Sequence, residues 1–148
     1  MKMILFVAAM ATLTAVSCTK DPGYRPYPTP TVAKSVQFSI HQQQDYSAVQ
    51  YNGLHAELKL AVSKFKKADG ETIVLWDSAV PMQSIRNFPP SHIPQIVIKS
   101  FGGINDYTET VQASFSILYK NALNEVRAFG MNDFAGFGVS TLTLPVRL

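Results

Sequence analysis

The chain has few residues that cross-link or ionise. Only one of its 148 residues is cysteine, so no disulfide can join two parts of it. Charged residues make up 16%, below the usual quarter, and the formal net charge is +3. The thirteen lysines and arginines are scattered, which argues against a nucleic-acid-binding surface. Because 47% of the residues are hydrophobic, the composition excludes a disordered chain, and the length allows one ordinary domain.

Familiar motifs of metal sites and catalytic sites are also missing. The three histidines are far apart and show no zinc-ligand spacing, and there is neither a G-x-S-x-G elbow nor an acidic calcium loop. Residues 130–138 are rich in glycine but lack the Lys-Ser/Thr pair of a phosphate-binding loop. We therefore expect no metal, no cofactor and no enzymatic activity.

The first eighteen residues have the layout of an export signal. Lys2 is followed by an uncharged run over residues 3–17, shorter than the roughly 20 apolar residues of a spanning helix. The run ends at Cys18, and residues 14–18 (TAVSC) resemble the lipobox of bacterial lipoproteins, with Ala15 where leucine is usual. The resemblance implies that residues 1–17 are a signal peptide and that Cys18 carries lipid. It also implies a place in a Gram-negative envelope, where we expect the outer membrane, facing the periplasm or the cell surface.

A proline-rich tether follows over residues 18–33. Four of the nine prolines lie here, and spaced prolines keep a chain extended. At roughly 3.1 Å per residue, fifteen such residues reach about 45 Å, enough to hold a domain clear of lipid headgroups. The expected partners are thus a bilayer, through Cys18, and an envelope protein.

Residues 34–148 alternate between apolar and polar side chains, which predicts strands. Residues 36–40 and 54–62 each place apolar side chains on one face. Asp69-Gly70 predicts a hairpin turn to residues 72–76 (TIVLW), which are apolar on both faces and so expected to be central. Further strands are predicted at 95–101 and at 141–148, the latter at an edge because of Pro145. The four prolines of residues 78–94 predict irregular structure.

Residues 107–129 have two interpretations. Residues 107–120 form either a strand with Val111, Phe115 and Ile117 on one face, or a helix that ends at Gly130. The β-branched composition favours the strand, followed by a turn at 121–124 and a short strand at 125–129. The sum is about seven strands, which predicts an all-β fold: a single antiparallel β-sandwich of immunoglobulin or fibronectin type.

Four residues are candidates for contact with a ligand or partner. Phe88 and His92 lie in a proline-rich loop, and Phe134 and Phe137 lie in the glycine-rich segment. The alternative for the last two, which we favour, is that they plug one end of the core, and Trp76 is also expected in the core. These residues suit a non-catalytic protein-binding subunit of an envelope complex. A glycan-binding module is the alternative, and a hydrolase with an unrecognised carboxylate pair is a third reading.

Overall fold

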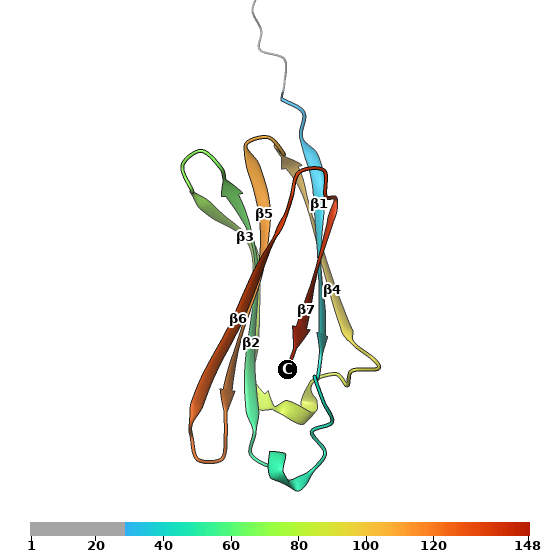
Figure 1. Ribbon diagram of the computed structural model, residues 1–148, viewed down its shortest axis with the longest axis vertical. Coiled ribbons are helices and arrows are strands. Elements are labelled where there is room, and N and C mark those ends of the chain that lie inside the picture. Colours follow the sequence, from blue (N-terminus) through green and yellow to red (C-terminus); the bar gives the residue numbers. More distant parts are fainter. Residues whose placement is uncertain (1–28) are drawn as a thin grey trace, which may run out of the picture.

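Seven strands supply nearly all the regular structure of residues 29–148, which are the residues that the computed structural model describes (Figure 1). The predictions for the signal peptide, Cys18 and most of the tether fall outside this range. The strands are β1 (Val32–His41), β2 (His55–Lys66), β3 (Thr72–Ser84), β4 (Gln95–Ile104), β5 (Glu109–Lys120), β6 (Val126–Ala135) and β7 (Thr141–Arg147). Two single 3-10 turns, η1 (Val49–Tyr51) and η2 (Ile85–Asn87), are the only helical segments described. None of this part of the chain forms a helix long and apolar enough to cross a membrane.

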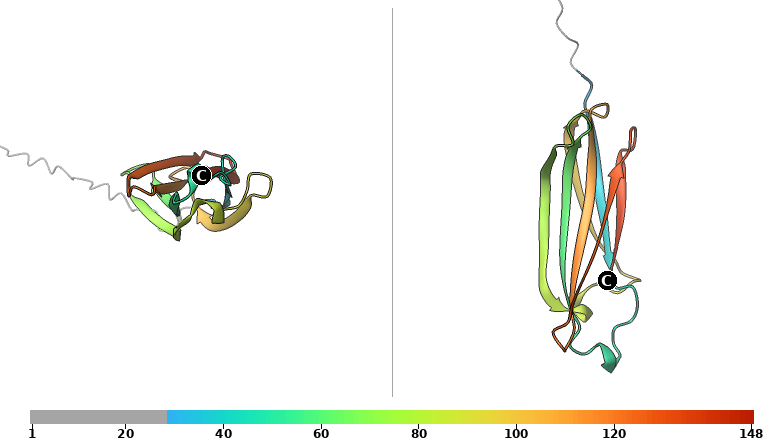
Figure 2. Two further views of the ribbon diagram at one scale, coloured as in Figure 1. Left: turned by 90° about the horizontal axis from the view of Figure 1, so that it is seen from below. Right: turned by 60° about the vertical axis from the view of Figure 1, so that its left-hand side comes forward.

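The strands form two sheets that pack face to face along the length of the molecule (Figures 1 and 2). One sheet has four strands in the order β3-β2-β5-β6, and the other has three in the order β4-β1-β7. The predicted seven-stranded sandwich is confirmed, and every pair is antiparallel except β1 with β7. As in immunoglobulin domains, the second strand pairs with the fifth, but β3 stays beside β2 in the same sheet.

The core lies between the inner faces of the two sheets. Its side chains come from alternate positions of β1, β2, β5 and β7, as period-two patterning predicts for strands with one buried face. They include Val36 and Phe38 on β1, Leu58 on β2, Phe115 on β5 and Leu144 on β7. Tyr107 lies just before β5, and the strand interpretation of residues 107–120 is confirmed.

The β2–β3 hairpin forms where Asp69-Gly70 predicts it. Gly70 has φ of +76°, a left-handed conformation that glycine adopts without the strain of a Cβ atom. The N–H of Gly70 donates to the carbonyl oxygen of Lys66, and the N–H of Lys66 donates to the carbonyl oxygen of Glu71. These bonds set the register of the hairpin.

Two predictions about β3 are wrong. Residues 72–76 belong to an edge strand, because β2 pairs with β5 on its other side, and Trp76 is only partly buried. Its ring lies 6.0 Å from that of Phe38, and the Lys99 ammonium lies 5.0 Å from the ring centre. The strand also continues to Ser84, through part of the segment expected to be irregular. Pro81 is tolerated because an edge strand has one side without hydrogen-bond partners.

The prediction for residues 125–138 needs a similar correction. The turn at 121–124 is confirmed, but β6 continues through Gly130 to Ala135 and does not end near residue 129. The twelve residues of β5 supply the reason, because they offer backbone partners along the whole of β6, from Lys120 opposite Val126 to Val111 opposite Ala135. The loop is therefore confined to the few residues between β6 and β7.

That loop is fixed by a buried ion pair. Lys34 on β1 is only 1% exposed, and its ammonium lies 2.5 Å from a carboxylate oxygen of Asp106. The same ammonium donates to the carbonyl oxygens of Gly136 (3.0 Å) and Val139 (2.9 Å), while Asp106 accepts from the N–H of Gly138 (3.0 Å). Hydrogen bonding from Lys34, and then from Gly138, holds the pKa of the Asp106 carboxyl below 3.8.

This pKa shift predicts a loss of stability in acid. Because the folded-state pKa of Asp106 is lowered, its contribution is fully present above the unfolded-state pKa near 3.8 and is lost as pH falls through the folded-state value. Asp106→Asn should therefore lower the Tm at pH 7, and the gap to the wild type should narrow between about pH 4 and pH 2. Thermal unfolding followed by circular dichroism measures both curves.

Asp45→Asn is the matched control, because Asp45 is an exposed carboxylate that bonds only to nearby Ser47. It should lower the Tm at pH 7 by less than Asp106→Asn does. A gap between wild type and Asp106→Asn that stays constant down to pH 2 would contradict the role given to the Lys34–Asp106 pair.

Candidate functional site

The residues predicted as contacts do not form one site. Phe88 is 4% exposed and packs in the core, because the turn of η2 directs it inward, so it offers no surface to a ligand. His92 is exposed in the connection between η2 and β4. Phe134 is the last residue but one of β6, and Phe137 follows in the β6–β7 loop, which lies at the opposite end of the sandwich (Figure 1).

The prediction that Phe134 and Phe137 plug the core is wrong. Phe134 packs only edge-on against Phe65, with ring centres 6.2 Å apart, and Phe137 lies 5.3 Å from the ring of Tyr107. Phe134 is 46% exposed because it lies opposite Gln112 on the outer face of β6, and Phe137, in the β6–β7 loop, is 65% exposed.

The histidines are likewise separate. His41 ends β1 and has an Nδ1 atom that is buried without a hydrogen-bond partner, whereas Nδ1 of His55 lies 3.0 Å from the carbonyl oxygen of Gly53. Residues 29–148 contain no cluster of three or more histidine, cysteine, aspartate or glutamate side chains placed to hold a metal ion.

The unusual feature of the molecule is the inner face of β6. In the β5–β6 ladder, Phe115 lies opposite Met131 and Ile117 lies opposite Phe129. Directly opposite residues of an antiparallel pair point to the same face, so Phe129 and Met131 point inward with the core residues of β5. They are nevertheless 54% and 46% exposed, because the three-stranded sheet ends at β7 and does not extend over β6.

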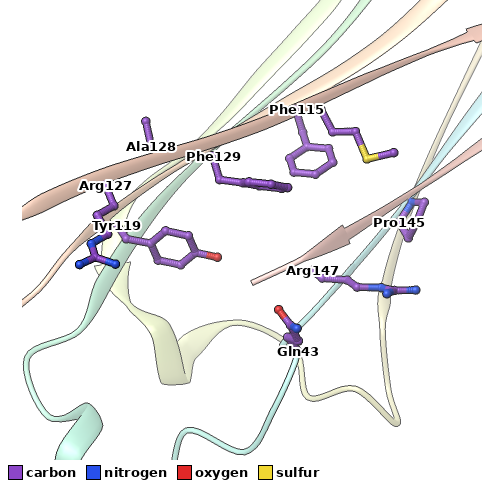
Figure 3. Close-up of a pocket in the computed structure, with 9 residues that line it drawn as sticks. Gln43, Phe115, Tyr119, Arg127, Ala128, Phe129, Pro145 and Arg147 are labelled. Carbon is purple, nitrogen blue, oxygen red and sulfur yellow. The ribbon is translucent and has the colours of Figure 1, made fainter.

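The uncovered face forms a cleft of about 730 Å³ between β6 and β7, which we call the β6 cleft (Figure 3). The rings of Phe115, Tyr119 and Phe129 face its interior (Figure 3). The two strands meet at the loop held by Lys34 and separate toward the other end of the molecule (Figure 1). The lining of the cleft reaches that other end, at Tyr119, Arg127 and Arg147. The complete lining is Gln43, Phe115, Tyr119, Arg127, Ala128, Phe129, Met131, Pro145 and Arg147.

Polar groups of the β6 cleft lie at its open end. Arg127 stands opposite Tyr119 on the inner face, and Arg147 and Gln43 lie on the β7 side. Neither guanidinium forms an ion pair with a carboxylate of residues 29–148. Burial raises the pKa of Tyr119 to about 12, so its hydroxyl keeps its proton and can donate a hydrogen bond. The cleft is therefore apolar along its length and rich in hydrogen-bond donors at its mouth.

Two ion-paired carboxylates of the sandwich, Asp106 and Glu109, are poorly suited to acid catalysis. Hydrogen bonding from Lys64 lowers the pKa of Glu109, just as Lys34 lowers that of Asp106. A general acid at neutral pH needs a raised pKa, so these two ion-paired groups serve structure better than proton transfer. The β6 cleft itself is lined by no aspartate or glutamate.

The sequence-based prediction missed the β6 cleft because it ended this strand at residue 129, before Met131. The signal was present in the alternation of Arg127, Phe129 and Met131, which continues the period of two beyond residue 129. Comparison of the chain with protein-family models, curated proteins and solved structures finds no match. The residues of the site are therefore the basis for inferring function.

The partial exposure of the cleft predicts which residues stability depends on. Phe129→Ser with Met131→Ser should change the free energy of unfolding by no more than about 1 kcal/mol, because both side chains already contact water. Phe115→Ala should cost about 3–5 kcal/mol, because Phe115 is buried beneath them. Urea unfolding measures both values, and equal losses would show that Phe129 and Met131 belong to the core.

Proposed function

We propose that the protein is a membrane-anchored lipoprotein of the bacterial envelope whose β-sandwich is a non-catalytic, protein-binding subunit of a larger complex. The observation that carries the proposal is the β6 cleft. Phe129 and Met131 form an exposed apolar surface on what is geometrically a core face, and soluble domains rarely leave such a surface uncovered without a use. Aromatic and methionine side chains with arginine beside them are also the composition favoured at protein interfaces.

The placement of the cleft suits a tethered protein. The tether enters β1 at Val32, whereas Gln43 follows the other end of β1, and Arg147 pairs with His41 at that same end. The mouth of the β6 cleft is thus at the end of the sandwich opposite to the one where residue 31 joins β1. A partner can reach it from the side that faces away from the membrane.

A glycan-binding module is the second candidate, favoured by the aromatic pair at the tether end. Tyr107 and Phe137 are each 65% exposed, with ring centres 5.3 Å apart at 57°, and exposed aromatic faces stack on sugar rings. Retention on polysaccharide gels by the wild type and its loss in Phe134→Ala with Phe137→Ala are expected for this candidate. A wild type that is not retained removes it.

Cross-linking in native membranes tests the protein-binding proposal. The full-length protein should cross-link to a stoichiometric envelope protein, and Phe129→Ser with Met131→Ser should reduce the recovery about tenfold or more, as for loss of central apolar contacts. Val74→Ser with Ile98→Ser is the matched control, because it removes two comparably exposed side chains from the outer faces of β3 and β4, and it should leave the recovery unchanged.

Cys18→Ala tests the anchor in the same experiment. It should release the folded protein from the membrane fraction and reduce the yield of the cross-linked complex. A wild-type protein that stays in the membrane fraction and cross-links to no protein would contradict the proposed function. Retention of Cys18→Ala in the membrane fraction would contradict the anchor.

A further inference from the structure

The outer edge of β6 is an unpaired strand edge with open backbone groups. The N–H of Asn121 donates to the carbonyl oxygen of Glu125, and the Thr110 hydroxyl donates to that of Ala135, so odd-numbered residues of β6 direct their backbone groups toward β5. Because these groups alternate along a strand, the even-numbered residues direct theirs to the free edge. The N–H of Phe134 is taken by the carboxylate of Asp133. The open positions are Val126, Ala128, Gly130 and Asn132.

The edge of β7 across the cleft is less suited to pairing. The N–H of Leu148 donates to the carbonyl oxygen of His41 on β1, and the N–H of Ser35 on β1 donates to the carbonyl oxygen of Ser140. The even-numbered residues of β7 therefore direct their backbone groups toward β1. The odd-numbered residues of β7 direct their backbone groups toward the cleft, and among them Pro145 has no N–H to donate. By contrast, β6 carries neither proline nor a charged residue from Ala128 to Asn132. Proline and charge normally protect an edge strand, so of the two edges beside the cleft β6 is the open one.

The charge of the cleft indicates the chemistry of its occupant. Arg127 and Arg147 lie at its mouth, the lining holds no carboxylate, and the Tyr119 hydroxyl adds another donor. An occupant with a carboxylate at that end would receive charge-assisted hydrogen bonds. A second copy of this chain fits less well, because its own β6 would bring another Arg127 and has no carboxylate between Val126 and Asn132.

We infer that the β6 cleft takes up an extended, acidic segment of the partner protein, which adds to β6 as a fifth strand of the four-stranded sheet. The inference deepens the proposed function and rests on it. Backbone hydrogen bonds to the even-numbered residues of β6 hold the segment, as in other cases of strand addition to an open edge. Its inward side chains are apolar and lie beside Phe129 and Met131, and an acidic side chain reaches Arg127 at the mouth.

Synthetic peptides test the chemistry of the occupant against the full-length protein in detergent. The probe is a nine-residue, end-capped peptide of alternating valine and threonine with one glutamate near an end, and its partner carries lysine in place of glutamate. Fluorescence anisotropy should show the glutamate peptide binding about tenfold more tightly, as expected for one charge-assisted hydrogen bond. Arg127→Gln should remove this preference. Lys59→Gln, which removes an equally positive but outward-facing residue of β2, should preserve it.

N-methylated versions of the same peptide test strand addition itself. Methyl groups on alternate amides block hydrogen bonding along one edge of an extended peptide and leave its side chains unchanged. Methylation of one alternating set should abolish binding, and methylation of the other set should change it by less than about threefold, because only one edge faces β6. Ala128→Pro should weaken binding of the unmethylated peptide, because it removes an N–H from the free edge of β6.

Four outcomes overturn the inference. If no peptide binds but cross-linking to a protein still depends on Phe129 and Met131, the proposed function holds and strand addition is wrong. If no peptide binds and no protein cross-links, both are wrong. A dimer that forms with concentration and is lost in Ala128→Pro, without peptide binding, assigns the edge to a second copy. Thermal stabilisation by oleate in the absence of peptide binding assigns the cleft to an anionic amphiphile.

Discussion

Packing between the inner faces of two sheets holds this protein together. One sheet has four strands and the other has three, and this difference explains why β6 has an exposed inner face. Residues 29–148 contain no cysteine, so burial of apolar side chains between β2 and β5 on one side and β1 and β7 on the other must supply the stability. The four-stranded sheet has one strand more than the sheet packed against it, and its edge strand β6 keeps Phe129 and Met131 exposed on its inner face.

The two ends of the sandwich are built differently. At the tether end, Lys34 binds Asp106 and two carbonyl oxygens of the β6–β7 loop, which brings the first residues of β7 toward the last residues of β6. A buried ammonium is costly unless it is fully paired, and here one carboxylate and two carbonyl groups satisfy it. At the other end no comparable contact joins the described parts of β6 and β7, and the β6 cleft opens there. The Lys34 contacts thus hold β6 and β7 together at the tether end, and the other end leaves the β6 cleft accessible.

Much of the strand content was predictable because its signals are local. Alternation over residues 36–40 and 54–62, and the Asp69-Gly70 turn, depend only on neighbours in the chain, and the structure confirms them. Residues 72–76 were misplaced because an apolar run indicates burial on both faces but does not show which strands lie beside it. Of the predicted contact residues, Phe88 turned inward for a similar reason, since η2 bends the chain back onto the core.

The features that the sequence predicts and those that only the structure shows differ in the range of the interactions that determine them. The amino-acid sequence by itself determined that this is a chain of alternating strands with tight turns, because side-chain alternation and turn conformation are set within a few residues. Only the tertiary structure decided that β6 is an edge strand with an uncovered inner face. That result depends on which strands pair across more than a hundred residues, as β1 does with β7, and on how many strands each sheet receives. No short stretch of sequence carries that information.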